Sequence, residues 1–233
     1  MRLSDIQQYW DGQAHSDPMW AILTDPAKAG GRWDAKEFFA TGVRDINSVM
    51  EQATAWGKPA ARRTALDFGC GIGRLSQPLA DHFDKVYGVD ISPKMIALAG
   101  RHNRRGTRVE YLCNLAANLG EFEDRSMDMI YSLITLQHIR PSYVQRYIKE
   151  FLRVLAPGGL LLFQYPSEPI SWRSRLGRWR AVLSKPRPMY MNGMDRADVV
   201  ELLERCGGRV LEIRQDVDSI PGYHSFCYAV TRD

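Results

Sequence analysis

Leu66-Asp67-Phe68-Gly69-Cys70-Gly71-Ile72-Gly73-Arg74 joins an apolar strand pattern at residues 64–68 to a helical pattern that begins near Arg74. Three glycines stand at alternate positions in the turn between them. Glycine adopts positive φ angles and lets a ligand approach the backbone without a Cβ in the way. A helix that follows directs its free N–H groups toward such a ligand. The stretch therefore predicts a turn that holds a nucleotide or a similar molecule.

The glycine spacing distinguishes three kinds of nucleotide-binding turn. A phosphate-binding loop of the form G-x-x-x-x-G-K-[ST] is absent from the sequence. A dinucleotide-binding turn of the form G-x-G-x-x-G lacks its third glycine, because Arg74 and Ser76 occupy the two possible positions. The pattern acid-x-Gly-x-Gly-x-Gly is complete from Asp67 to Gly73. An acid before the turn would repel a pyrophosphate and suits a ligand with cationic groups, such as S-adenosylmethionine.

A second strand pattern, at residues 85–89, runs into an acid at Asp90. A carboxylate at the end of such a strand can accept hydrogen bonds from both ribose hydroxyls of a nucleoside. Dinucleotide enzymes use the same arrangement, so Asp90 indicates adenosine binding without identifying the cofactor. The alternative is that Asp90 only caps the next helix, but Ser92 is better placed for that task.

Strand and helix patterns alternate from residue 63 onward. Short apolar strand patterns lie at residues 64–68, 85–89, 108–112, 127–132, 159–165, 209–215 and 225–231. Helical patterns lie between most of them, at residues 74–82, 93–101, 141–155 and 195–206. This alternation predicts an α/β fold with a parallel sheet that helices cover on both faces. The ligand is then expected at the carboxyl edge of the strands.

Composition and charge exclude several classes of protein. The 233 residues suffice for one large α/β domain or two small ones, and the net charge of +4 does not by itself imply nucleic-acid binding. The four cysteines are far apart, which disfavours a zinc site or a disulfide framework and fits a reducing compartment. A polar N-terminus and short aliphatic runs predict a cytoplasmic protein without a signal peptide or a membrane span.

With both acidic motifs in place, residues 63–165 resemble the class I S-adenosylmethionine-dependent methyltransferases, and the later strands resemble them more loosely. Residues 126–132 are similar to the family's fourth strand, and Leu136-Gln137-His138-Ile139 to the segment after it. Residues 155–159 are similar to the family's Leu-Lys-Pro-Gly-Gly turn, with alanine in place of the lysine. The resemblance implies a Rossmann-like, seven-stranded, mostly parallel sheet with helices on both faces and an antiparallel last strand.

The resemblance also implies S-adenosylmethionine as the cofactor, and no metal. We expect its site to form from the glycine turn, the end of the second strand, the segments after the third and fourth strands, and the N-terminal segment. The residues expected to contact it are Asp67, Gly69, Cys70, Gly71, Gly73, Asp90, Ile91, Met95, Asn114, Leu115, Leu133, Tyr9 and Trp10.

One position departs from the family pattern. After the third strand the family often has Gly-Asp, whose acid accepts a hydrogen bond from the adenine amino group, whereas this chain has Cys113-Asn114. The side-chain carbonyl of Asn114 can accept the same bond without a charge. The alternative is that Asn114 only forms a turn.

His138 is the best candidate for a catalytic base. The resemblance implies an in-line displacement, in which a base is needed only where the acceptor must lose a proton first. His138 follows the fourth strand, and the unperturbed pKa of histidine suits proton removal near neutrality. The alternative is that His138 forms part of the wall of the site.

Residues 1–60 are rich in aromatic and polar residues and predict a cap of two or three helices, the last at about residues 35–56. Tyr9 and Trp10 are the best candidates to reach the cofactor, because a sulfonium over an aromatic face forms a cation–π contact. For Trp20, Trp33 and Trp56 we favour simple packing of the cap against residues 61–233, the predicted core.

Residues 166–194 interrupt the alternation and predict a basic lid insert after the fifth strand. Trp172, Leu176, Trp179 and Leu183 share one helical face, and arginines occupy the others. Arg173, Arg175 and Tyr190 are the candidate substrate-binding residues. The arginines would recognise an acidic acceptor, attach to RNA or an anionic membrane, or form a solvated face.

The sequence thus favours methyl transfer to O or N of a small, acidic or aromatic metabolite. The alternatives are methylation of RNA or protein and a cofactor-binding protein without catalysis. No RNA-binding appendage is visible, so a small-molecule acceptor is favoured as the partner over nucleic acid. The oligomeric state is not indicated.

Overall fold

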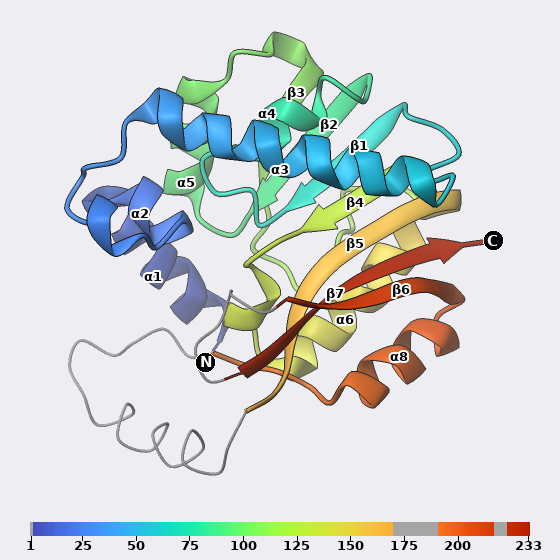
Figure 1. The fold of residues 1–233 in the computed structure, drawn as a ribbon. Coiled ribbons are helices and arrows are strands. Elements are labelled where there is room, and N and C mark those ends of the chain that lie inside the picture. Colours follow the sequence, from blue (N-terminus) through green and yellow to red (C-terminus); the bar gives the residue numbers. More distant parts are fainter. Residues whose placement is uncertain (1, 170–190, 217–222) are drawn as a thin grey trace.

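The computed structural model describes residues 2–169, 191–216 and 223–233. Within them, seven strands form one sheet in the order β3-β2-β1-β4-β5-β7-β6 (Figure 1). The strands are β1 (Thr64–Phe68), β2 (Lys85–Asp90), β3 (Val109–Cys113), β4 (Met127–Ser132), β5 (Leu155–Pro169), β6 (Gly208–Asp216) and β7 (Tyr223–Arg232).

The strand directions follow the expected plan. β1 pairs in parallel with β2 and with β4, β2 with β3, and β4 with β5. β7 lies between β5 and β6 and runs antiparallel to both. The predicted seven-stranded sheet with an antiparallel last strand is therefore confirmed.

Helices cover both faces of the sheet (Figure 1). The helices in the described ranges are α1 (Leu3–Ser16), α2 (Pro18–Ile22), α3 (Ala35–Ala55), α4 (Ser76–Leu79), α5 (Pro93–His102), α6 (Pro141–Val154) and α8 (Arg196–Arg205), with 3-10 turns at Pro26–Lys28, Gly106–Arg108 and Leu136–His138.

Alternation along the strands produces two apolar cores, one on each face. One core contains Leu66, Ile130 and Leu161 and packs against α6 and α8. The other contains Ala65 and Met129 and packs against α3 and α4. A third cluster, around Phe38, Ile72 and Met95, joins α1, α2 and α3 to the glycine turn and α5. The N-terminal helices are thus packed against the edge of the sheet where a ligand was expected.

Three predicted boundaries were wrong. β5 begins at Leu155, so residues 155–159, expected as a turn before the strand, belong to it. The helix expected at residues 74–82 is reduced to α4, because Pro78 tolerates only the first turn of a helix, where no N–H is needed. β5 runs on to Pro169 and pairs with β7 through Pro166 and Pro169, so the first residues assigned to the insert belong to this strand. Most of the insert, residues 170–190, lies outside the described residues. The division into a cap (1–60) and a core (61–233) stays a prediction.

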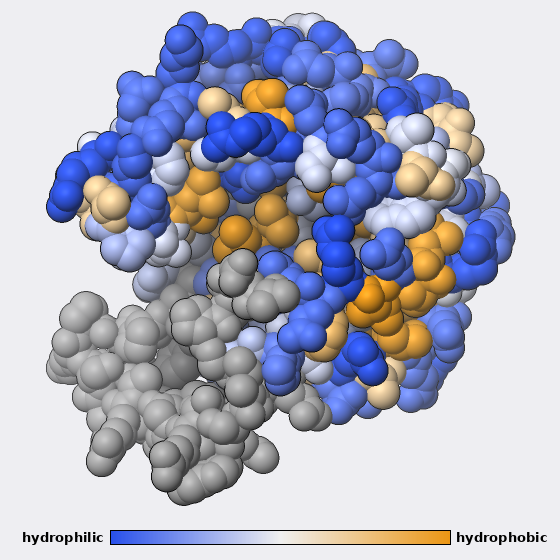
Figure 2. Space-filling model, viewed as in Figure 1, coloured by the Kyte–Doolittle hydropathy of each residue, from blue (hydrophilic) through white to orange (hydrophobic). Residues whose placement is uncertain are grey.

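The coloured part of the face shown in Figure 2 is largely hydrophilic, with apolar side chains gathered over the β7–β6 end of the sheet. No helix among residues 2–169, 191–216 and 223–233 is long and apolar enough to cross a membrane. All four cysteines are free, and the same residues contain no cluster of three or more potential metal ligands. The cytoplasmic location stays a prediction.

Candidate functional site

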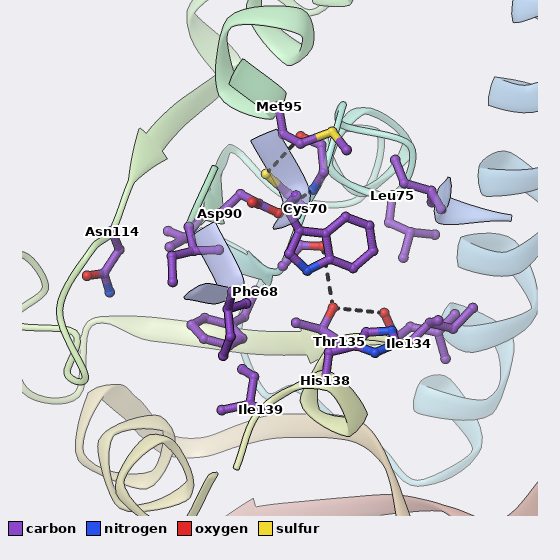
Figure 3. A pocket seen from close by; sticks show the side chains of 18 of the residues that line it. Phe68, Cys70, Leu75, Asp90, Met95, Asn114, Ile134, Thr135, His138 and Ile139 are labelled. Carbon is purple, nitrogen blue, oxygen red and sulfur yellow. Dashed lines mark hydrogen bonds between the residues drawn. The ribbon is translucent and has the colours of Figure 1, made fainter. Parts of the chain in front are cut away.

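A pocket opens at the carboxyl ends of β1, β2 and β4, under the N-terminal helices α1 and α2 (Figure 3). It encloses about 930 Å³ of empty space, counted with part of its open mouth. The glycine turn, the end of β2 and the segment after β4 form its walls. Ligand sites in α/β proteins commonly lie at this edge of the sheet.

The glycine turn brings the backbone of β1 against the end of β2. Gly69, Gly71 and Gly73 all have positive φ angles. The N–H groups of Gly69 and Cys70 donate to the carbonyl of Val89 at 2.7 and 3.0 Å. Gly69, Cys70 and Gly71 line the pocket, as expected. Gly73 does not line it, and the hydroxyl end of Tyr111 packs where a Cβ at this position would stand.

Asp90 is fixed between two backbone donors. Its Oδ2 accepts from the N–H of Gly71 at 2.9 Å, and its Oδ1 accepts from the N–H of Ser92 at 2.8 Å. Desolvation raises the pKa of this carboxyl, and the two hydrogen bonds oppose that rise. Asp90 lines the pocket, so its carboxylate couples the glycine turn to the end of β2. Ser92 caps α5 through its Oγ, as the sequence indicated.

Asp67 stands behind the glycine turn rather than in the pocket wall. Its side chain is buried and accepts a hydrogen bond from Ser76 Oγ at 2.5 Å. Desolvation raises the pKa of Asp67 to about 6, although Ser76 and Arg74 lower it. The Asp67 carboxylate would therefore attract a cationic ligand across the glycine turn, without touching it.

The region expected for adenine is formed only in part by the predicted residues. Ile91, Met95 and Asn114 line the pocket. The Oδ1 of Asn114 accepts from the N–H of Ala116 at 2.7 Å, and its Nδ2 donates to the carbonyl of Asn118. The turn-forming role considered for Asn114 is therefore present, and a contact with adenine stays a prediction. Leu115 points to solvent with 55% exposure and does not line the pocket.

His138 closes the pocket beyond β4. Burial lowers its pKa to about 4, so the imidazole is neutral near pH 7. Its ring lies edge-on to the indole of Trp10, with 5.5 Å between the ring centroids. Leu133 lines the wall as predicted, and Ile134 and Thr135 line it as well (Figure 3).

The N-terminal helices cover the pocket through one face of α1 and the end of α2. Trp10 lines it, whereas Tyr9 does not and packs edge-on against Trp10. Ile22 of α2 contacts the position where a Cβ on Gly71 would stand. Trp33 and Trp56 pack in apolar clusters, as favoured from the sequence. Trp20 donates its indole N–H to the carbonyl of Asp25.

Some lining residues were not found by sequence reasoning. Leu3, Ile6 and Trp10 recur at intervals of three and four, which places them on one helical face and would have revealed the first two. Arg74 also lines the pocket, and it bonds Asp45 of α3 at 2.5 Å. Thr135 carries no comparable signal in the sequence. The candidate substrate-binding residues Arg173, Arg175 and Tyr190 lie outside the described residues.

Comparison with known proteins identifies the central part of the chain. Residues 66–163 match the model of a family described as a methyltransferase domain. Over 128 residues the chain is 35% identical to phosphoethanolamine N-methyltransferase 2 of Caenorhabditis elegans. This alignment covers 54% of this chain and 28% of that enzyme. Over 134 residues it is 31% identical to a ubiquinone biosynthesis O-methyltransferase of Pseudomonas fluorescens. This alignment covers 57% of this chain and 56% of that enzyme. The matched part therefore spans about a quarter of the first relative's length and about half of the second's.

Solved structures share the fold at low sequence identity. Magnesium protoporphyrin IX methyltransferase from Synechocystis PCC 6803, with bound SAH, has a TM-score of 0.71 and 21% identity, and the match covers 99% of both chains. An S-adenosylmethionine-dependent methyltransferase from Clostridium acetobutylicum has a TM-score of 0.60 and 16% identity, covering 79% of this chain and 89% of that one.

Proposed function

We propose that this chain, whose residues 66–163 match a methyltransferase domain, is a class I S-adenosylmethionine-dependent methyltransferase that transfers a methyl group to an oxygen or nitrogen of a small acceptor. The observation that carries the proposal is the placement of the Asp90 carboxylate in the pocket, between the N–H groups of Gly71 and Ser92. Each of its oxygens keeps a lone pair that a ribose hydroxyl can use.

The glycine turn fits such a ligand. A Cβ at Gly69 or Gly71 would collide with Thr135 or Ile22, so only glycine fits at these two positions of the pocket wall. S-adenosylmethionine supplies an electrophilic methyl group on a positively charged sulfur. The pocket contributes position and exclusion of water, and the carboxylates of Asp67 and Asp90 favour a cation.

His138 is proposed to orient the acceptor. Among the described residues, neither His138 Nδ1 nor the amide oxygen of Gln137 has a hydrogen-bond partner, and both are buried. The amide nitrogen of Gln137 lies 3.3 Å from His138 Nε2. Half a turn of the amide puts its oxygen there to accept the Nε2 proton, which leaves Nδ1 with a lone pair. Nδ1 then accepts a hydrogen bond from an O–H or N–H of the acceptor. An imidazole with so low a pKa is a weak base, which favours orientation over proton removal.

The walls near His138 favour an aromatic or otherwise apolar acceptor. Trp10, Ile139 and Leu3 line the pocket together with His138. A planar apolar group would gain burial and ring contacts there. A small molecule is therefore proposed as the acceptor in preference to RNA or protein.

Calorimetric titration tests the cofactor. S-adenosylmethionine and its demethylated product, S-adenosylhomocysteine, are expected to bind, and NAD is not. Asp90→Asn is the matched variant, since it keeps the shape of the side chain and replaces one acceptor oxygen by a donor. Preferential binding of NAD would overturn the proposal.

Transfer of a labelled methyl group tests the reaction. The protein is incubated with methyl-labelled S-adenosylmethionine and a metabolite extract, with and without nuclease and protease. Label is expected in small molecules after either treatment. Label found only in nuclease-sensitive or protease-sensitive material would refute the small-molecule acceptor, and binding without any transfer would indicate a non-catalytic protein.

A further inference from the structure

The turn after β4 has an unusual backbone. Ile134 has a φ of 58°, and a β-branched residue is a genuine outlier in this left-handed region. Such a conformation persists only where the surrounding structure holds it in place. Because Leu133, Ile134 and Thr135 all line the pocket, whatever holds Ile134 also sets the shape of this wall (Figure 3).

A residue of β5 holds the backbone of Ile134 in this conformation. Gln164 is 1% exposed, and its Oε1 accepts the N–H of Ile134 at 3.0 Å. Its Nε2 donates to the carboxylate of Asp216 at the end of β6. An ionised carboxylate only accepts hydrogen bonds, so Asp216 requires the amide nitrogen on its own side. The amide oxygen must then face Ile134, which makes the orientation of Gln164 unambiguous.

The position of this turn matters to the glycine turn opposite. Thr135 donates its Oγ1 to the carbonyl of Leu133 at 3.0 Å. Its side-chain atoms lie 2.2 Å from the place where a Cβ on Gly69 would stand. The two turns are therefore in close contact, and a shift of the segment after β4 would narrow or widen the pocket between them.

We propose that Gln164, oriented by Asp216, is a positioning residue that fixes the Leu133–Ile134–Thr135 wall against the glycine turn and so sets the binding geometry of the pocket. Gln164 acts through the backbone of Ile134 and needs no contact of its own with the ligands. The inference rests on the proposed function only in that the pocket is taken as the site of S-adenosylmethionine.

Three variants test the role of Gln164. Gln164→Leu keeps much of the side-chain volume and removes the hydrogen bonds to Ile134 and Asp216. Gln164→Glu keeps the shape, and when protonated it can donate to Asp216 and accept from Ile134. Thr231→Val is the matched control, because Thr231 on β7 is equally buried and donates one side-chain hydrogen bond to the carbonyl of Gly159 on β5, and neither residue lines the pocket.

Hydrogen exchange gives a readout that needs no ligand. Peptides that cover residues 131–139 are expected to exchange faster in Gln164→Leu than in the wild type and in Thr231→Val, at matched thermal stability. Unchanged exchange in this segment would refute the restraint. The exchange measurement does not depend on binding of S-adenosylhomocysteine. Failure of the inference about Gln164 is therefore distinguishable from failure of the proposed function.

Binding of S-adenosylhomocysteine tests the consequence for the pocket. Gln164→Leu is expected to weaken it roughly tenfold, comparable to one lost hydrogen bond, and Thr231→Val to leave it unchanged. An equal loss in both variants would mean that Gln164 serves general stability only and would overturn the proposal.

The pH dependence of S-adenosylhomocysteine binding by Gln164→Glu tests whether a protonated glutamate can replace Gln164. The titratable groups that the structure describes around this side chain include Asp216, Arg214 and Glu212 on β6, Cys227 on β7 and Tyr131 on β4. Beside the Asp216 carboxylate, a buried glutamate holds its proton to a higher pH than usual. Affinity relative to the wild type is expected to recover as pH falls from about 8 to about 5, where the glutamate is protonated. If the affinity of Gln164→Glu relative to the wild type does not change with pH, the proposed orientation of the Gln164 amide is contradicted.

Discussion

Replacement of Gly69 by alanine separates backbone strain from close approach at the glycine turn. Gly69 has a φ of 79°, where an L-residue costs about 1–2 kcal/mol relative to glycine. The added Cβ would also stand 2.2 Å from side-chain atoms of Thr135, and overpacking of this kind costs about 1–3 kcal/mol. The two terms together predict a loss of about 2–5 kcal/mol in the free energy of unfolding.

Gly30→Ala is the matched control for this prediction. Gly30 has a φ of 78°, and an added Cβ would meet nothing within 4 Å. Only the backbone term of about 1–2 kcal/mol applies there. Any gain from a stiffer unfolded chain is the same in both variants and cancels in the comparison.

Urea denaturation of both variants, with titration of S-adenosylhomocysteine, measures the difference. Gly69→Ala is expected to unfold more easily than Gly30→Ala by about 1–3 kcal/mol and to lose ligand binding, which Gly30→Ala keeps. Adding Thr135→Ala to Gly69→Ala should recover part of the stability. Equal losses in the two glycine variants would refute the close approach of the two turns.

Four further outcomes are expected. Asp90→Asn should weaken S-adenosylhomocysteine binding at least about tenfold by calorimetry, since an amide cannot accept from both Gly71 and Ser92; unchanged affinity would remove Asp90 from the site. A cationic ligand favours ionised Asp67, whose pKa is raised to about 6, so S-adenosylmethionine should bind more tightly as pH rises from 5 to 7, and Asp67→Asn should flatten that rise. Because the pKa of His138 is lowered to about 4, the pH–rate profile should show no loss from its protonation above about pH 5; a His138-dependent fall near pH 6.5 would contradict this. Asp11 accepts from Ser92 Oγ at 2.5 Å, so Asp11→Ala should speed hydrogen exchange in α1 with a stability loss of only about 1 kcal/mol; unaltered exchange would show that α1 is held by apolar contacts alone.

The regular elements follow closely from the sequence where apolar patterns end at turn residues. β1 and β4 have the predicted bounds, and α3 ends within one residue of its prediction. β5 is longer because proline lacks only the N–H donor. The carbonyl of Pro166 still accepts from Met194 at 3.2 Å, and the strand continues beyond it.

The candidate site was predictable where a motif specifies the backbone. The glycine turn and Asp90 fall into this group, because their residue types suit only a few conformations. The spacing of motifs cannot show which of two adjacent helical residues faces a pocket, and so Trp10 lines it while Tyr9 does not. Gln164 was beyond prediction as well, since its partners Ile134 and Asp216 are distant in sequence and meet only across the sheet.

The placement of β7 between β5 and β6 sets the order in which the sheet can be completed. β6 is made before β7, yet β7 is the strand through which it joins the sheet. β6 therefore cannot join the sheet before β7 has been made, whether β7 inserts between β5 and β6 or the β6–β7 pair docks onto β5 as one hairpin. Until then β5 and β6 both expose unpaired backbone groups, which are open to wrong partners.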